Sequence, residues 1–305
     1  MPRAQREWGQ VAITQKSSSP CTVRLDRLRF SAEPRRRTKA STIKGFVVAQ
    51  DFRVKPQGKL PTYSRVRKLR SRTTSSSVVV QYKAQQPWLR PCAVTVIGDD
   101  TLGITPEELE RIAEQFCNCK LSLVELALDF DPSTGVDRDD VLHHWLFGKA
   151  RRRADRGGPG SLRFGSRSSP KIVRCYAKSE IGNFRVELEI HGALLRGMGI
   201  TDIPNLYLVA SKVSPKHVRV VGVRWKTLAA HLNRRFGSKG SAMLDETRRR
   251  RDELSLRDAL RFLSEQGVPN PHRFLKPLRL NDEIKVALRR WSKKFYTLVG
   301  ELPTK

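Results

Sequence analysis

The stretch FGSRSSPKIVRCYAKSEIGNFRVELEIH, residues 164–191, has the two-residue periodicity of two β-strands joined by a turn. Successive side chains of a strand point to opposite faces, so the apolar residues of each run share one face and the polar residues the other. The apolar faces carry Val173, Cys175 and Ala177, then Phe184, Val186, Leu188 and Ile190. The polar faces carry Arg174, Tyr176 and Lys178, then Arg185, Glu187, Glu189 and His191. The apolar faces predict a core, and the polar faces call for a further explanation.

A segment upstream shows the same alternation with acidic residues. In LVELALDFD, residues 123–131, Glu125, Ala127 and Asp129 fall on one face, opposite Leu126 and Leu128. If these strands share one sheet with their polar faces together, carboxylates, a phenol, an imidazole and cations meet. Carboxylate oxygens suit Mg²⁺ or Mn²⁺. Cations beside a tyrosine, whose reference pKa is about 10, favour its nucleophilic phenolate form. The pattern therefore predicts a site with a metal and a nucleophile.

Each of these signals also has a purely structural interpretation. A strand tyrosine between Arg and Lys is typical of a half-buried packing residue with a solvated hydroxyl. Alternating glutamates are typical of a wet sheet face balanced by arginines across the strands. The pair His143 and His144 falls on an expected helix, where one side chain packs and the other meets solvent, so we assign it no catalytic role.

The composition favours a polyanionic partner. The chain has 305 residues, 38% of them hydrophobic, and Lys plus Arg number 59 against 30 Asp plus Glu, a formal net charge of +29. Such an excess exceeds what solubility requires. No apolar run is long enough for a membrane span, and MPRAQREWGQVAITQ, residues 1–15, lacks the apolar stretch of a signal peptide. We expect a cytoplasmic protein without a membrane partner, whose five irregularly spaced cysteines are reduced thiols.

The order of the segments predicts an α+β fold with a mainly antiparallel sheet, flanking helices and a small basic helical region at the C-terminus. We expect a basic, partly ordered region with short strands over 1–90, a catalytic α+β domain over 91–225 and the helical region over 226–305. Thr105 and Glu108 form an expected capping box, and Ser255 with Asp258 another. The run TRRRRDE, residues 247–253, is expected to be a linker or an edge that contacts phosphates.

The basic runs have two interpretations, a solvated arm or a set of phosphate contacts. Those near the expected site are the candidate DNA-binding residues. They are Arg151, Arg152, Arg153, Arg163, Arg167 and Lys171.

Four short motifs resemble, in their order, the replication initiation factor family. They are Gly165-Ser166-Arg167-Ser168-Ser169, Arg174-Cys175-Tyr176-Ala177-Lys178, Arg185-Val186-Glu187-Leu188-Glu189 and the upstream VELALDF with Glu125 and Asp129. This family comprises the rolling-circle initiators and related relaxases of plasmids, conjugative elements and filamentous phages. The resemblance covers residues 120–195, about a quarter of the chain.

The resemblance implies a relaxase-like core that nicks one DNA strand at an origin. Tyr176 would attack the strand, keep the 5′-phosphate as a phosphotyrosine and release a 3′-hydroxyl that primes synthesis; later strand transfer would reseal the circle. Arg174, Arg185 and Lys178 would complete the catalytic set, with Mg²⁺ or Mn²⁺ as cofactor. The implied metal ligands are Glu125, Asp129, Glu187 and Glu189. The chain departs from the family at Leu123, where Arg is usual, at Glu125, where Asp is commoner, and in lacking a His-hydrophobe-His motif.

We expect origin DNA, duplex and single-stranded, as the partner, with a host helicase and polymerase as further partners and a homodimer as one assembly. The main alternative is a basic protein that binds DNA or RNA without catalysis. A tyrosine recombinase or integrase ranks third, because its nucleophile usually sits on a helix whereas Tyr176 is expected on a strand.

Overall fold

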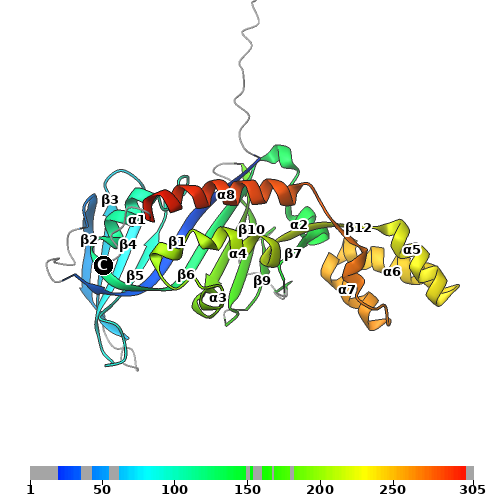
Figure 1. Ribbon diagram of the computed structural model, residues 1–305, viewed down its shortest axis with the longest axis horizontal. Helices are drawn as coiled ribbons and strands as arrows, with labels where there is room; N and C mark the ends of the chain where they lie inside the picture. The colour runs from blue at the N-terminus through cyan, green and yellow to red at the C-terminus, as the bar shows by residue number, and fades with distance from the viewer. Residues whose placement is uncertain are drawn as a thin grey trace, which may run out of the picture.

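Ten antiparallel strands form one sheet in the computed structural model of the chain (Figure 1), which describes residues 20–35, 43–54, 62–148, 152–153, 160–166, 168–178 and 182–299. Across the sheet the order is β2 (Phe46–Arg53), β3 (Tyr63–Ser71), β4 (Ser77–Ala84), β5 (Cys92–Ile97), β1 (Cys21–Pro34), β6 (Phe116–Phe130), β11 (Asn183–His191), β10 (Lys171–Lys178), β9 (Leu162–Phe164) and β8 (Arg152–Arg153). The protein therefore has an α+β fold with a mainly antiparallel sheet, as the sequence predicts.

The expected boundary at residue 90 does not divide this sheet. Strand β1 lies between β5 and β6 and pairs with both along much of its length. Its backbone groups need partners on both sides, so the strands before residue 90 and after residue 91 build one sheet. The basic run over 64–77 is also more ordered than expected, because it supplies most of β3, where Val66 and Leu69 are buried. Residues 36–42, which hold much of the basic run near Pro34, lie outside the described residues.

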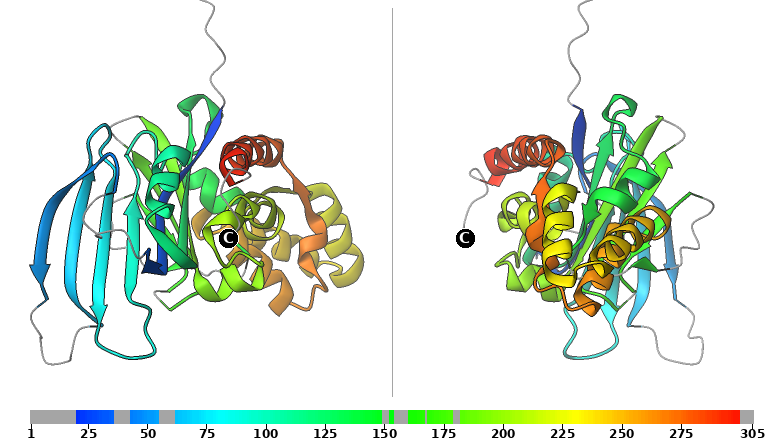
Figure 2. Two further views of the ribbon diagram at one scale, coloured as in Figure 1. Left: turned by 60° about the vertical axis from the view of Figure 1, so that its left-hand side comes forward. Right: turned by 90° about the vertical axis from the view of Figure 1, so that its right-hand side faces the viewer.

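Helices cover one face of the sheet and complete its core (Figure 2). They are α1 (Pro106–Ala113), α2 (Arg138–His144), α3 (Gly192–Gly197), α4 (Leu208–His217) and α8 (Leu280–Val299), with the short 3₁₀ turns Pro132–Thr134 and Ile203–Asn205 between them. Leu288 and Trp291 of α8 pack with Leu28 of β1 and Leu126 of β6 in one cluster of buried residues. The capping box of Thr105 and Glu108 is present at the start of α1. Since one face is covered by helices, the polar residues of the strands lie on the other.

The remaining helices, α5 (Trp225–Phe236), α6 (Lys239–Glu253) and α7 (Leu256–Glu265), lie together at one end of the molecule (Figure 1). They pack around a smaller core that contains Leu228, Leu232 and Leu263. A three-stranded sheet joins them to the main body, with strands in the order β13 (Leu275–Pro277), β12 (Arg219–Val223) and β7 (Trp145–Leu146), and the 3₁₀ turn Pro271–Phe274 precedes β13. Helix α8 returns from this end to the main core.

The run over 247–253 belongs to α6, so it is a helix and not a linker. Ion pairs between residues three and four apart hold it in the helix: Arg249 contacts Glu246 and Glu253, and Arg250 contacts Glu246. Pairs at this spacing stabilise exposed helices by about 0.2–0.5 kcal/mol each.

The five cysteines all lie in the described residues and form no disulfide, and Cys21, Cys92 and Cys175 are buried. None of the helices in the described residues combines the length and the apolar character needed to cross a bilayer.

Candidate active site

The strand register brings the expected site residues onto one face. In β6 and β11, Asp129 pairs with Arg185, and Glu125 pairs with Glu189. In β11 and β10, Arg185 pairs with Tyr176, and Glu187 pairs with Arg174. Directly paired residues of antiparallel strands share a face. Carboxylates, a phenol and cations therefore lie on one face of three adjacent strands.

The Tyr176 hydroxyl donates a short hydrogen bond to Oε1 of Glu187. Burial raises the pKa of Tyr176 above its usual value, and the hydrogen bond to the Glu187 carboxylate and its negative charge raise it further. Arg185 lowers the pKa of Tyr176, as expected of a neighbouring cation, but burial and Glu187 outweigh it in the protein by itself. Arg174 is directed to glutamates and Lys178 to the Asp100 carbonyl, and the tyrosine rests as a neutral phenol next to a base.

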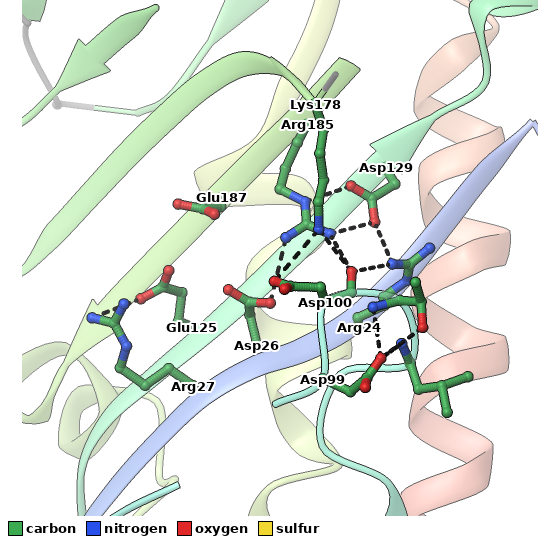
Figure 3. A network of polar contacts seen from close by, with 12 residues as sticks. Arg24, Asp26, Arg27, Asp99, Asp100, Glu125, Asp129, Lys178, Arg185 and Glu187 are labelled. Carbon is green, nitrogen blue, oxygen red and sulfur yellow. Dashed lines mark hydrogen bonds and ion pairs between the residues drawn. The ribbon is translucent and has the colours of Figure 1, made fainter. Parts of the chain in front are cut away.

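Three carboxylates form a cluster that could hold a metal ion. Asp26, Glu125 and Glu187 each offer an oxygen, and these oxygens lie within 4.8 Å of one another (Figure 3). Two of the three were expected from the sequence, and Asp26 was missed. Between Leu25 and Arg27 the register of β1 against β6 shifts by one residue, which marks a β-bulge that takes Asp26 out of the regular alternation. The sequence signal was the two consecutive polar residues, Asp26 and Arg27, between buried leucines.

The charge state of Glu125 supports a metal at this cluster. Its side chain is buried, and burial together with the negative charge of Glu187 raises its pKa to about 7, although Arg174 acts in the opposite direction. Its Oε2 atom accepts no hydrogen bond from the described residues, although the Arg27 guanidinium lies 3.4 Å away. Carboxylate oxygens are the ligands that Mg²⁺ and Mn²⁺ prefer, and a divalent cation would offset the repulsion between Glu125 and Glu187. The residues present therefore fit such an ion.

The other two expected metal ligands, Asp129 and Glu189, lie outside this group of three oxygens. Asp129 accepts two hydrogen bonds from Arg185, at 2.6 Å from Nε to Oδ1 and 3.0 Å from Nη2 to Oδ2. Glu189 contacts Arg174 at 2.9 Å and His191 at 2.9 Å. Glu125 and Glu187 also pair with arginines, so ion pairing does not separate the two sets. The group of oxygens within 4.8 Å of one another is what places Asp129 and Glu189 beside the cluster.

Three cations converge on one oxygen atom at the edge of this cluster. The backbone carbonyl of Asp100 accepts hydrogen bonds from Arg24 at 3.0 Å, Lys178 at 2.7 Å and Arg185 at 3.4 Å (Figure 3). It lies in the loop between β5 and α1. Gly103 gives this loop a left-handed turn with φ +71° and lies against the backbone of Leu25. The loop thus directs a partial negative charge at a point where positive charges gather.

The candidate DNA-binding residues are placed unevenly. Arg163 of β9 pairs with Arg174 of β10, and its Nε atom is buried with no hydrogen-bond partner among the described residues. Arg152 and Arg153 form β8 beside it. Lys171 is buried, and its ammonium group donates to the Phe147 carbonyl at 2.7 Å, which turns it away from a ligand. Arg151 and Arg167 lie outside the described residues.

Comparisons with known proteins add little to this geometry. No protein-family model matches the sequence, and no curated protein matches it. Among solved structures, a rolling circle replication initiator protein from Geobacillus stearothermophilus is similar, with 16% sequence identity, a TM-score of 0.38 and coverage of 66% of this chain and 87% of that chain. A likeness this distant carries no argument about function, which has to come from the site.

Proposed function

We propose that the protein is a rolling-circle replication initiator that nicks and rejoins one DNA strand at an origin, with Tyr176 as the nucleophile. The observation that carries the proposal is the hydrogen bond from Tyr176 to Glu187, one of the three clustered carboxylates, beside three convergent cations. A hydroxyl with an adjacent base and positive charge for the phosphate are what transfer of a phosphodiester to a side chain requires.

In the proposed reaction, the Tyr176 oxygen attacks the phosphorus atom and its proton passes to Glu187. The bond from phosphorus to the 3′-oxygen breaks, and this oxygen takes up a proton to leave as a 3′-hydroxyl. The 5′-phosphate stays on Tyr176 as a phosphotyrosine. In the reverse direction a 3′-hydroxyl attacks the phosphotyrosine, Tyr176 regains its proton and the strand is resealed.

The cations that meet at the Asp100 carbonyl would bind the phosphate. Arg24, Lys178 and Arg185 donate to this oxygen in the protein alone. A non-bridging phosphate oxygen is a stronger acceptor for charged donors than a carbonyl. We therefore expect the DNA phosphate to replace the loop carbonyl among these donors.

Asp26, Glu125 and Glu187 would hold Mg²⁺ or Mn²⁺, with Asp129 and Glu189 keeping the neighbouring arginines in place. Such an ion supplies positive charge that stabilises the phosphate during transfer and lowers the pKa of a nearby hydroxyl.

Outside the site we assign DNA contacts to Arg163 and the basic helices at the C-terminal end, and we leave Lys171 out. In these helices the guanidinium groups of Arg248 and Arg251 lie 5.5 Å and 5.1 Å from the ring centre of Trp225. The same proposal includes contact with the origin duplex, with a host helicase or polymerase and with a second copy of the chain.

The experiment that tests the proposal compares wild type with Tyr176→Phe on supercoiled DNA that carries the neighbourhood of the gene, with Mn²⁺ or Mg²⁺. We expect nicked circles from wild type and none from Tyr176→Phe, with equal DNA affinity. Equal nicking by both proteins would reject Tyr176 as the nucleophile.

A second candidate is a protein that binds nucleic acid without catalysis. The observation that favours it is the pairing of the site's carboxylates with Arg24, Arg27, Arg174 and Arg185, because a balanced charge network is also a way to hold a sheet together. Under this alternative, wild type binds DNA but does not nick it, whichever divalent metal is added.

A further inference from the structure

The face that carries the site continues across the sheet as an open surface. In the register of the sheet one row of paired residues runs from β6 to the far edge: Glu125, Arg27, Ile97, Ser77, Arg70 and Val47. The next row is Leu123, Arg29, Thr95, Val79, Lys68 and Gln50. Four strand spacings separate Glu125 from Arg70, which is about 19 Å. The two rows therefore connect the acidic cluster to strand β2 along one face.

Beyond Arg27, which pairs with Glu125, the cations of this open face have no ion-pair partner among the described residues. Arg29, Lys68 and Arg70 are exposed, and none of them forms an ion pair with a described residue. From β1 to β2 the two rows contain no acidic residue. The only acidic residue of β2, Asp51, pairs with Arg67, which is opposite buried Val80 and so belongs to the helix-covered face. The open face is thus cationic.

The same face also presents apolar and aromatic surface. Val47, Phe52 and Ile97 are 41%, 42% and 41% exposed. Phe52 pairs with Val66, which is two residues along β3 from Lys68 and on the same face. The Lys68 ammonium lies 6.0 Å from the centre of the Phe52 ring. A hollow of about 590 Å³ lies on this face, lined by Lys68, Arg70, Ser77, Val79 and Ile97 among others. Figure 2 shows strands β2 to β5 extending past the helices on one side.

We propose that this open face of β2–β5 binds single-stranded DNA continuous with the strand held at Tyr176. Cations spaced along a groove beside exposed rings and apolar side chains are the features that hold unpaired nucleotides, since phosphates meet the cations and bases stack on the apolar surface. A duplex offers its phosphates but hides the faces of its bases. A second copy of the chain would bring its own three cations against this face, so like charges disfavour it. The inference that the bound strand continues to Tyr176 rests on the proposed function. The inference that single-stranded DNA binds on this face does not.

Anisotropy of a labelled oligonucleotide of about 20 nucleotides tests the proposal with the full chain in EDTA, so that cutting plays no part. A hairpin duplex of the same composition serves as the second probe. The variants are Lys68→Ala/Arg70→Ala and Phe52→Ala. The matched control is Arg289→Ala/Arg290→Ala, which removes two exposed cations from α8 on the helix-covered face. Circular dichroism and thermal unfolding establish that each variant folds as wild type does.

We expect Phe52→Ala to weaken single-strand binding by about 5- to 150-fold, the range for loss of one base-stacking contact. Lys68→Ala/Arg70→Ala should make the log-log salt slope shallower by about 1.4, at about 0.7 for each single-strand phosphate. Duplex affinity and the control should change little. Single-strand affinity equal to that of wild type in both variants would overturn the proposal. An equal loss of duplex affinity would also overturn it. So would the finding that wild type is a dimer and that these variants dissociate it. If the variants lose single-strand binding while wild type never nicks DNA, this inference stands and the proposed function fails.

Discussion

The hydroxyl of Tyr176 on β10 donates its hydrogen bond to Glu187 on β11, and Glu187 is at the same time one of three clustered carboxylates. A single residue therefore connects the proposed nucleophile to the proposed metal cluster. The pKa of Tyr176 is raised by burial first and then by this carboxylate, so the phenol loses its proton only when a base accepts it. The first prediction follows from that dependence.

Glu187→Gln should lower the single-turnover rate of DNA nicking by about 10²- to 10⁴-fold, the usual contribution of a positioned general base. An amide holds the tyrosine hydroxyl in place but cannot take its proton, so DNA affinity should stay near that of wild type. Glu189→Gln, two residues along the same strand and paired with Arg174 and His191, is the matched control and should retain more activity. Nicking at the wild-type rate by Glu187→Gln would remove this residue as the base.

Asp26→Asn should abolish the rise in melting temperature that Mn²⁺ gives wild type. An ion bound only by the folded protein stabilises it by about 2.7 kcal/mol at 100 times its dissociation constant. Asp100→Asn is the control, because its side chain is 86% exposed and lies outside the carboxylate cluster. If Mn²⁺ raises the melting temperature of Asp26→Asn as much as that of wild type, the ion binds elsewhere and the bulge of β1 supplies no metal ligand.

Much of the site could be predicted because β-strands alternate regularly. The faces of β6, β10 and β11 follow from a two-residue period, and their register then places Tyr176, Arg174 and Glu187 together. Asp26 escaped because a bulge breaks the period, and no local pattern pairs β1 with β6 across about 100 residues of sequence. The central position of β1 depends on the same long-range pairing. Helix α6 escaped because its many arginines resemble a solvated linker until their pairing with glutamates is known.

Arg185→Met should lower the free energy of unfolding by about 3–5 kcal/mol, because it leaves the buried Asp129 carboxylate without its main partner. Urea unfolding measures the effect. Arg289→Met, at an exposed position on α8, should change stability by no more than about 0.5 kcal/mol. The double variant Arg185→Met/Asp129→Leu should recover part of the loss. A single variant as stable as wild type would mean that solvent reaches Asp129.

Lys171→Met should change how stability depends on pH. Burial, and secondarily the charge of Arg257, lowers the pKa of Lys171 from 10.5 to about 8 in the folded protein, where His217 also lies near the ammonium group. Between about pH 8 and 10.5 the unfolded chain keeps a proton that the folded protein has lost, so the contribution of Lys171 to stability grows with pH. The contribution of Lys171 is complete above the pKa of about 10.5 that its side chain has in the unfolded chain. It is lost as the pH falls through about 8, the pKa in the folded protein.

Urea unfolding of both proteins from pH 7 to 10.5 measures this contribution as a difference, so that other titrating groups cancel. The stability of wild type relative to Lys171→Met should rise across the window by at most about 3 kcal/mol. A constant difference would show that the ammonium group is solvated. The variant should also keep the wild-type salt dependence of DNA binding, since Lys171 faces the Phe147 carbonyl.

The covalent bond between Tyr176 and DNA is the central claim, and one gel measures it. Wild type and Tyr176→Phe are each incubated with Mn²⁺ and 5′-radiolabelled or internally labelled single-stranded DNA from the neighbourhood of the gene, then separated under denaturing conditions. The account predicts that wild type forms a labelled protein–DNA band when the internal label lies 3′ to the cut. DNA labelled at its 5′ end should give no labelled band, because Tyr176 keeps the fragment 3′ to the cut. Tyr176→Phe should give no such band with either label. Wild type that binds this DNA and forms no covalent band with any divalent metal would contradict it.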